Sequence, residues 1–495
     1  MIVLTPAQMR DADAQACAVV GDDTLMQAAG RAVAAAMRDR AKGRRAIAFA
    51  GSGNNGGDAF AALAELSGFE CTIYAQPAGE PSRARKAAEQ RARAAGVRVE
   101  PFPQTPDDAA MALREADVVA VGLAGTAARY PLPEAFANVV RAVNDSNVPA
   151  IAIDIPPGVD GETGAVHEPA LRAAETVTLG AMKSGLLLCE DASLAGSVSV
   201  ADIGMPPETL RSQQPLYAAL TDGELHALLP RRASNSDKRS AGAPFIVAGS
   251  EQFPGAAVLC AMGSARAGAG YVTVATPSAA AHALRMHLIE QVVVTIDPSH
   301  EPGAVVDDLL EMSARCSSLA IGPGLGLDDR TGEIVRGLLK RTTLPAVADA
   351  SALFHLSKHL GDLRGKQLVL TPHAGEFARL SGRGTVLPGT RAQRLREFVD
   401  RTGITTLLKG DRTLIYDGST MHVNTTGTPA LATAGTGDVL TGIIATLLSQ
   451  GLSVTDAARA GAHWHGLAAR SAERQRVRGV IARDVYEALG PSVSG

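Results

Sequence analysis

Short apolar runs alternate with longer stretches of helical periodicity along most of the chain. In the first half the predicted strands are residues 45–51, 71–75, 117–122, 149–156 and 176–180. Residues 59–66 and 133–143 are predicted to be helices between them. Such alternation is typical of an α/β protein that is built on a parallel sheet.

The alternation breaks at residues 204–242, which are rich in Pro, Ser and Arg and contain one short predicted helix near residues 222–229. Beyond this junction the alternation resumes. The predicted strands are residues 244–250, 271–277, 291–296, 318–324, 345–350, 367–372, 405–410 and 413–418, and helices follow near residues 436–449, 455–472 and 481–489. The halves share no motif, and no internal repeat of about 20–50 residues is apparent. We therefore predict two different α/β domains, residues 1–213 and 214–495.

Composition excludes several classes of partner. Of the 495 residues, 46% are hydrophobic and 20% are charged, and the formal net charge is −4, with Lys and Arg spread along the chain. This balance argues against nucleic-acid and membrane-surface partners, and an aromatic content of 3% argues against base-stacking platforms. The five cysteines are far apart and match no metal-ligand spacing, so reduced thiols are expected. Neither a signal-peptide pattern nor a run of membrane length is seen, which predicts a cytoplasmic location.

The stretch "ATAGTGDVLTG", residues 432–442, places three glycines around Asp438 where a helical apolar run begins. Glycines at a helix start let backbone N–H groups approach an anion that the helix dipole already favours. A carboxylate there would repel a phosphate, so its presence calls for a separate explanation. Two interpretations stay open at this point: Asp438 is a general base, or it caps the helix.

A second glycine-rich loop, "AFAGSGNNGGDAF" at residues 48–60, follows a strand and opens a helix. Its position is that of a Rossmann phosphate loop, but Asn54, Asn55 and Asp58 add side-chain donors and acceptors. The loop could hold a phosphate, a ribose or a monovalent cation, or it could be a tight turn only. Asp154 ends another predicted strand at its carboxyl edge, where open α/β sheets bind ligands. Together these residues suggest one crevice.

Six motifs occur in one order: "GSGNNGGDAF", "IDIPPGVDGETG", "GPGLG", "TPHAGEFARL", "LLKG" and "TAGTGDVLTG". This set closely resembles the bifunctional NAD(P)H-hydrate repair enzymes, and the resemblance covers about residues 5–489. It implies a Rossmann-like, three-layer epimerase-type domain followed by a ribokinase-like dehydratase domain. The epimerase of that family interconverts the R and S hydrates of NADH or NADPH, written NADHX and NADPHX. The dehydratase restores the cofactor from the S form at the expense of ADP.

The resemblance also implies the roles of individual residues. In the second domain, Asp438 would be the base, and His373 would reach the substrate unless it is only a structural hydrogen-bonder. The other substrate-lining residues would be Ala256, Gly324 and Gly326, and the ADP site would comprise Lys409, Gly410, Asp411, Arg412, Thr413, Gly435, Thr436 and Gly437. In the first domain the ligand would contact Asn54, Asn55, Gly56, Gly57, Asp58 and Asp154, with Asn55 also binding potassium.

The same resemblance implies the small molecules and the assembly. ADP is the expected phosphoryl donor, Mg²⁺ the expected metal of the second domain, and K⁺ that of the first. NADHX, NADPHX and ADP are the expected partners of a homo-oligomer that binds neither nucleic acid nor membrane.

The chain departs from the family in ways that bear on the first domain. Val121 stands where the family carries an Asp that binds potassium and takes part in proton transfer, and Pro157 replaces a potassium-site Ser. Neither residue can supply an acid–base group or a cation ligand. We therefore predict a working dehydratase with a weakened epimerase. In the second domain, the usual D-A-D reads Asp349–Ala350–Ser351.

Two rival functions remain. The first is a ribokinase-like kinase that phosphorylates a vitamin-like alcohol, which "AGTGD" alone permits but "TPHAGEFARL" and the fused "NNGGD" domain argue against. The second treats residues 1–213 as a binding module that keeps the ligand loop without catalysis.

Overall fold

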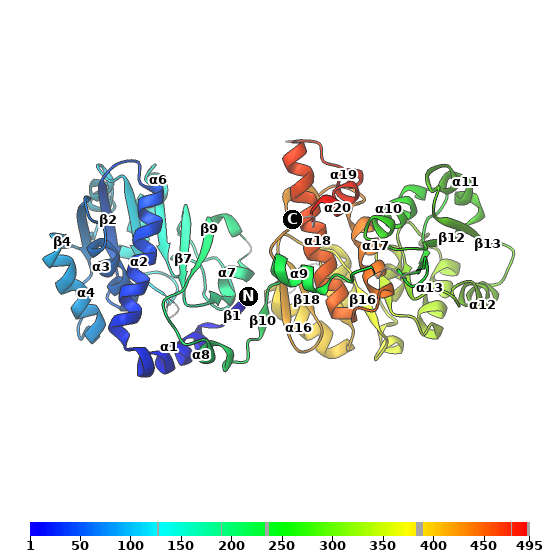
Figure 1. Cartoon of the computed structure of the whole chain (residues 1–495), viewed down its shortest axis with the longest axis horizontal. Coiled ribbons are helices and arrows are strands. Elements are labelled where there is room, and N and C mark those ends of the chain that lie inside the picture. Colours follow the sequence, from blue (N-terminus) through cyan, green and yellow to red (C-terminus); the bar gives the residue numbers. More distant parts are fainter. Residues whose placement is uncertain (126–127, 190, 233–236, 383–389, 477, 493–495) are drawn as a thin grey trace. The chain divides into compact units, whose positions relative to one another are not determined.

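The computed structural model describes residues 1–125, 128–189, 191–232, 237–382, 390–476 and 478–492 (Figure 1). The chain forms two compact units, Met1–Ala218 and Ala219–Gly495. This division lies a few residues beyond the boundary expected at residue 213. The two units are described separately below.

The first unit is built on a parallel sheet with the strand order β4-β3-β2-β5-β6-β7-β9. Its strands are β2 (Arg45–Ala50), β3 (Glu70–Ala75), β4 (Arg98–Pro101), β5 (Val118–Gly122), β6 (Ala150–Ile153), β7 (Glu175–Leu179) and β9 (Ser197–Ala201). Its helices are α1 (Pro6–Val20), α2 (Asp22–Arg40), α3 (Asn54–Ala64), α4 (Arg83–Ala94), α5 (Pro106–Leu113), α6 (Glu134–Asp145), α7 (Ser184–Leu188), η1 (Ala192–Ala195) and α8 (Pro207–Arg211). Helices α1 to α4 share a hydrophobic cluster on one face of the sheet, and α5 and α6 share another, which makes three layers.

Strand β5 shows how the sequence divides between the two faces. Successive side chains of a strand point to opposite sides of the sheet. Val118 and Ala120 accordingly belong to the cluster under α1 to α4, whereas Val119 and Val121 belong to the cluster under α5 and α6. Because both faces are covered, the strand is apolar throughout, as the sequence pattern predicted.

A smaller set of strands connects the two ends of the first unit. Strand β1 (Ile2–Leu4) pairs in parallel with β8 (Met182–Lys183) and antiparallel with β10 (Tyr217–Ala218). Just after β1, Thr5 and Gln8 form a capping box at the start of α1. The Nε2 atom of Gln8 also donates to the carbonyl oxygens of Gln213 (2.8 Å) and Gln214 (3.2 Å). Helix α1 is thereby fixed at its N-terminal end.

The second unit has the strand order β13-β12-β11-β14-β15-β16-β17-β18-β19, parallel from β13 to β17 and antiparallel thereafter. Its strands are β11 (Pro244–Val247), β12 (Thr273–Pro277), β13 (Val292–Ile296), β14 (Ser318–Ile321), β15 (Ala346–Ala348), β16 (Leu368–Leu370), β17 (Thr405–Leu408), β18 (Thr413–Tyr416) and β19 (Met421–Asn424). Its helices are α9 (Asp222–Leu228), α10 (Pro254–Arg266), α11 (Ser278–His287), α12 (Pro302–Met312), α13 (Asp329–Arg341), α14 (Ser351–Leu356), η2 (Leu360–Leu363), α15 (Ala374–Ser381), α16 (Arg391–Thr402), η3 (Pro429–Leu431), α17 (Thr436–Ser449), α18 (Val454–Gln475), α19 (Ala482–Glu487) and α20 (Leu489–Ser492).

Helix α17 runs through the core of this unit and crosses α10 closely. A side chain at Gly442 would overlap the carbonyl oxygen of Cys260, and one at Gly263 would come within 2.7 Å of the carbonyl oxygen of Val439. Glycine at both positions therefore lets the two helix backbones approach. This packing brings the first turn of α17 to the edge of the sheet, and the helix has the bounds that its apolar periodicity predicted.

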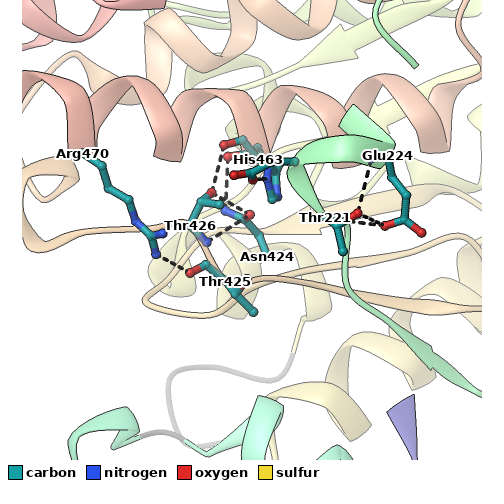
Figure 2. A network of polar contacts seen from close by, with 9 residues as sticks. Thr221, Glu224, Asn424, Thr425, Thr426, His463 and Arg470 are labelled. Carbon is teal, nitrogen blue, oxygen red and sulfur yellow. Dashed lines mark hydrogen bonds and ion pairs between the residues drawn. The ribbon is translucent and has the colours of Figure 1, made fainter. Parts of the chain in front are cut away.

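Helix α18 is held against β19 by a network of polar contacts (Figure 2). The Nδ2 atom of Asn424 donates to the carbonyl oxygen of Ala462 (3.1 Å), and the Thr426 hydroxyl donates to that of His463 (2.9 Å). Farther along α18, seven residues after His463, the Arg470 side chain donates to the Thr425 carbonyl oxygen (2.6 Å). These contacts fix α18 along its length. In the described part of the chain, none of the helices combines the length and the apolar character that crossing a bilayer requires.

Candidate functional site

The site of the second unit lies where neighbouring parallel strands end. Asp349 follows β15, His373 follows β16 closely, and Lys409 follows β17, so all three lie at the carboxyl edge of the sheet. The first turn of α17 reaches the same place: a side-chain carbon at Gly437 would be 3.3 Å from Lys409 Nζ and 3.7 Å from Asp349 Oδ2. The fold therefore brings Lys409, Gly437 and Asp438 together around Asp349, a residue to which the sequence analysis assigned no role.

Asp349 and Lys409 form a buried ion pair. Lys409 Nζ lies 2.8 Å from Asp349 Oδ1, and the Thr441 hydroxyl donates to Oδ2 at 2.9 Å. The side chain of Asp349 is 2% exposed. Burial acts to lower the pKa of Lys409, but the charges of Asp349, Glu376 and Asp438 outweigh it and raise that pKa above its usual value. A permanently charged ammonium group therefore faces the start of α17.

Asp438 lies in the first turn of α17 and does not cap the helix. The N-cap is Gly435, with φ +88°, and no side chain caps this end. The capping interpretation is therefore wrong. Burial and the nearby charge of Asp349 raise the pKa of Asp438 to about 7, against the opposing effect of Lys409. Asp438 can consequently change its protonation state near neutral pH.

The backbone before Asp438 can bind an anion. The N–H groups of the first helical turn have no carbonyl partner inside the helix. The Thr436 hydroxyl donates to the carbonyl oxygens of Leu431 (2.8 Å) and Thr433 (2.9 Å), so this residue offers the site its backbone only. A ring nitrogen of His465 hydrogen-bonds to the Thr436 backbone, and burial lowers the pKa of His465 to about 4. A neutral histidine thus supports the loop from inside the core.

The segment after Lys409 is a turn between β17 and β18. The Thr413 hydroxyl donates to the Gly410 carbonyl oxygen (3.0 Å). Arg391 donates to the carbonyl oxygens of Lys409 and Arg412, both at 3.3 Å. Asp411 is exposed. This arrangement leaves Lys409 at the sheet edge and gives the turn a fixed shape.

His373 has a structural task at the start of α15. Its Nδ1 accepts hydrogen bonds from the backbone N–H groups of Gly375 (3.0 Å) and Glu376 (3.4 Å). Its own N–H donates to Glu376 Oε2 (2.8 Å), which completes a capping box. Because Nδ1 accepts, we assign the ring proton to Nε2. The side chain is 61% exposed, so its Nε2–H can still donate to a ligand.

The small residues predicted to line the substrate site fall into two groups. Gly324 has φ +67°, and a side-chain carbon there would lie 2.9 Å from that of Ala256, so these two residues are neighbours. Gly326 instead lies against Asp328, the N-cap of α13. Its carbonyl oxygen is 3.0 Å from His355 Nε2. Gly326 is therefore explained by packing against α13 and α14.

The first unit contains a cavity of about 550 Å³ on the side of α1 and α2. The predicted residues Asn54, Asn55, Asp58 and Asp154 line it. Gly56 and Gly57 lie beneath, where side chains would meet Gly51, Arg85 and Met26. These two glycines therefore allow α3 to pack closely and do not contact the cavity.

Four further charged residues that the sequence did not single out line this cavity: Arg10, Asp13, Asp22 and Lys183. Lys183 is 1% exposed; its Nζ lies 2.5 Å from Asp154 Oδ1 and donates to the Leu179 carbonyl oxygen. Burial and the charges of Asp154 and Asp13 raise the pKa of Asp58 well above its usual value. The carboxyl groups of Asp13, Asp58 and Asp154 thus influence one another and the Lys183 ammonium group.

Asn55 has an unused acceptor at this cavity. Its Nδ2 donates to the Ile153 carbonyl oxygen (3.1 Å), which fixes the amide orientation. Its Oδ1 is buried and finds no hydrogen-bond partner among the described residues. A buried carbonyl oxygen without a partner is unfavourable unless a ligand or cation satisfies it. Asp154, nearby, has φ +70°, an uncommon backbone conformation for a residue other than glycine.

Val121 and Pro157 do not create a gap in this cavity. Val121 packs with Phe49 and Phe102 in the cluster under α5 and α6, and it is not among the lining residues. Pro157 is buried, and its carbonyl oxygen accepts from the Leu171 N–H (2.8 Å). The absence of a carboxylate at Val121 therefore leaves the cavity with four carboxyl groups, those of Asp13, Asp22, Asp58 and Asp154.

Both halves of the chain match known protein families. The sequence profile of the NAD(P)H-hydrate dehydratase family matches residues 245–490, and that of the YjeF-related protein N-terminus matches residues 22–185. The bifunctional NAD(P)H-hydrate repair enzyme of Moorella thermoacetica is 36% identical over 99% of this chain and 96% of its own. That of Mycobacterium leprae is 35% identical over 94% of this chain and 92% of its own. This chain belongs to the family of bifunctional NAD(P)H-hydrate repair enzymes.

Solved structures resemble the dehydratase half of the repair-enzyme fold. The ADP/ATP-dependent NAD(P)H-hydrate dehydratase of Bacillus subtilis, co-crystallised with ATP and Mg²⁺, is 28% identical, with a TM-score of 0.48. The match covers 55% of this chain and 96% of that one. A ribokinase-like superfamily protein of Enterococcus faecalis V583 is 26% identical over 56% of this chain and 94% of its own, with a TM-score of 0.49.

The family assignment confirms the predicted α/β class, with a ribokinase-like second unit, and the resemblance drawn from the six motifs. Because relatives that cover nearly the whole chain are repair enzymes, the assignment argues against the kinase alternative. Sequence reasoning missed Asp13, Lys183 and His465, which occur in segments with no motif of their own. It noted Asp349 only as part of an altered triplet, although a carboxylate at a strand end was a usable signal.

Proposed function

We propose that the second unit dehydrates the (6S) hydrates of NADH and NADPH at the expense of ADP, and that the first unit interconverts the R and S hydrates. One observation carries the dehydratase proposal: Asp438, with a pKa of about 7, stands at an anion-binding helix start beside the charged Lys409. That combination suits proton removal from a hydroxyl group next to a phosphate.

The dehydration needs the ring hydroxyl group converted into a leaving group. Asp438 takes the hydroxyl proton while the oxygen attacks the β-phosphorus of ADP, and AMP leaves. The N–H groups at Gly435–Gly437 and the Lys409 ammonium hold the charge that develops on the transferred phosphoryl group. The phosphorylated carbinolamine then expels phosphate with the electron pair of the ring nitrogen. Loss of a proton from the adjacent ring carbon restores the dihydropyridine.

The residues of the second site fit a metal that is bound mainly through the nucleotide. Asp349 is already engaged by Lys409 and Thr441, and the Ser351 hydroxyl donates to the Leu325 carbonyl oxygen (2.6 Å). Among the described residues, no group of three or more His, Cys, Asp and Glu side chains could hold a metal ion. Mg²⁺ commonly keeps several waters and binds substrate phosphates, and because Asp438 has the role of base here, the nucleotide phosphates and water would supply most of its ligands. Bound there, Mg²⁺ would neutralise phosphate charge.

In the first unit the unpartnered Oδ1 of Asn55 is the atom that would take a potassium ion. The ion would supply a fixed positive charge for the diphosphate or for the hydrated ring. Neither Val121 nor Pro157 adds a side-chain ligand, so we expect weak binding and a small effect of K⁺ on the rate. We further expect a cytoplasmic homo-oligomer that binds neither nucleic acid nor membrane, in keeping with a net charge of −4.

The decisive experiment supplies the purified full chain with mixed R and S hydrates and with ADP, ATP or no nucleotide, and follows NADPH formation and the nucleotide products. A repair enzyme converts the S form rapidly, the R form in a slower phase, and forms AMP from ADP in equal amount. A stable phosphorylated product with no NADPH would instead support a kinase.

A further inference from the structure

One face of α1 forms part of the wall of the first unit's cavity. Met9, Arg10, Asp13 and Cys17 line the cavity from this helix. Their spacing of one, four and eight residues places them on a single side of it. The capping box and the contacts of Gln8 with the end of the unit hold this helix in place. Asp13 is therefore presented to the cavity by a fixed element.

The other three carboxyl groups of the cavity are already engaged or deeply buried. Asp22, at the start of α2, accepts a hydrogen bond from the Asp23 N–H (2.9 Å). Asp154 is paired with Lys183 and also accepts from the Leu179 N–H (3.2 Å). Asp58 is 8% exposed, and burial together with the charges of Asp154 and Asp13 raises its pKa, which favours the protonated form. Asp13 is half-buried, and among the described residues no hydrogen bond or ion pair engages it. It is the carboxyl group that a ligand in the cavity can reach.

The charge balance of the cavity gives Asp13 a specific use. With the protonated form of Asp58 favoured and Asp154 paired with Lys183, a protonated Asp13 adds no charge to these four groups. The remaining charged lining residues, Arg10 and Asp22, have opposite signs. Loss of the Asp13 proton creates one negative charge. That charge complements a cationic intermediate in a site partly shielded from water.

We propose that Asp13 is the catalytic acid–base residue of the epimerase reaction in the first unit. It donates its proton to the hydroxyl oxygen of the R hydrate; the carbon–oxygen bond breaks and its electron pair leaves with water. The lone pair of the ring nitrogen forms the carbon–nitrogen double bond of an iminium ion, which the Asp13 carboxylate stabilises. Water then adds to the opposite face of that carbon and releases a proton to solvent, and solvent returns a proton to Asp13. This proposal rests on the epimerase function proposed above.

The pH dependence of kcat/KM for the R hydrate should follow the protonation of Asp13. Burial and the charge of Asp154, partly opposed by Lys183, raise the pKa of Asp13 to about 6. Since the first step needs the protonated acid, kcat/KM for the R hydrate should fall as pH rises above about 6. The titratable and charged groups that share the cavity with Asp13 are Arg10, Cys17, Asp22, Asp58, Asp154 and Lys183.

The test uses the full chain, R hydrate with ADP, and the variants Asp13→Asn, Asp13→Glu and Asp11→Asn. Asp11 is an exposed carboxylate on the same helix that does not line the cavity, so it is the matched control. We expect Asp13→Asn to slow R-hydrate consumption ~100-fold or more, to the rate of spontaneous epimerisation, and to abolish the pH dependence. Asp13→Glu should regain part of the rate, and Asp11→Asn should match the unmodified chain.

Turnover of pure S hydrate by the second unit is measured in the same samples, and it should be unchanged in every variant. An Asp13→Asn protein that keeps more than a third of the R-hydrate rate, or that keeps the pH dependence, would overturn the role of Asp13. If the unmodified chain does not accelerate R-hydrate consumption at all, the epimerase function itself is wrong, and the S-hydrate rates still decide the dehydratase function.

Discussion

Lys409 Nζ, just after β17, and Asp349 Oδ1, just after β15, lie 2.8 Å apart, and the Asp349 side chain is almost wholly buried. Breaking a buried ion pair by removing one partner leaves an uncompensated charge, which typically costs about 3–5 kcal/mol. We expect Asp349→Asn to lower the free energy of unfolding of the second unit by an amount in this range, measured in denaturant. The control is Asp362→Asn, which removes an exposed partner of Lys340 and should change little. Equal effects of the two substitutions would contradict a structural role for the buried pair.

Asp438→Asn should lower kcat/KM for S-hydrate dehydration by ~100-fold or more, because a positioned general base is lost. In the unmodified chain, kcat/KM should rise about tenfold per pH unit up to about pH 7 and then level off, since the carboxylate is the active form. The variant should lack this limb. A variant that keeps more than about a tenth of the rate would exclude Asp438 as the base.

The same substitution should make the fold more stable at high pH. The raised pKa means that the folded state binds a proton that the unfolded state releases between about pH 4 and pH 7. Stability due to this group is therefore lost as pH rises through about 7. Relative to the unmodified chain, Asp438→Asn should gain thermal stability at pH 8 and show no gain near pH 4.

ADP should raise the thermal midpoint of the second unit, because a ligand bound only to the folded state stabilises it, by about 2.7 kcal/mol at a hundredfold excess over Kd. Lys409→Ala should shrink this shift, whereas Lys340→Ala, at an exposed lysine of the same unit, should preserve it. Differential scanning fluorimetry with AMP, ADP and ATP measures the effect. The nucleotide-site assignment fails if none of the three moves the midpoint.

Gly435 and Gly437 are separated by one residue, yet replacement by alanine should have opposite effects on stability at the two positions. Gly435→Ala forces a side chain onto a φ of +88° and into Leu259, so we expect a loss of about 1–2 kcal/mol of stability. Gly437 is the second residue of α17 and is not among the glycines with positive φ, so its backbone accepts alanine without strain. The alanine methyl group would stand 3.3 Å from Lys409 Nζ and obstruct a phosphate. Gly437→Ala should therefore keep or raise the unfolding midpoint while weakening ADP binding, and an unaltered ADP titration would contradict this account.

Val121→Asp should damage the first unit and not improve epimerisation. The new carboxylate would be buried beside Phe49 and Phe102, away from the cavity, where an unpaired polar group is strongly unfavourable. We expect a loss of at least ~2 kcal/mol of stability and no gain in R-hydrate turnover, with Val121→Ala as the control for lost packing. A faster epimerase with Val121→Asp would show that this position reaches the ligand.

The sequence predicted the fold better than the roles of single residues. Apolar runs such as those of β5 and β16 are buried on both faces, so their period and length identify them directly. Helices α1 and α2 were not predicted, since each is rich in alanine and weakly amphipathic. The role of Val121 depends on which face of β5 its side chain occupies, and that of Gly326 on which helix packs against it. Spacing along the chain does not contain that information. The sequence alone pointed to Asp438 as a candidate, because the glycine-rich helix start that carries it is formed by residues close together in the chain.

Strand β1 has a consequence for how the protein is made. Ile2 pairs with Ala218, and Val3 and Leu4 are wholly buried in the finished unit. A ribosome that adds about 5–20 residues per second needs roughly 10–40 s to reach residue 218 after the first codons. Of the two strands that pair with β1, β8 is made only at residues 182–183 and β10 only at residues 217–218. The pairing of β1 can therefore be completed only after β10 has been made, late in the synthesis of the first unit.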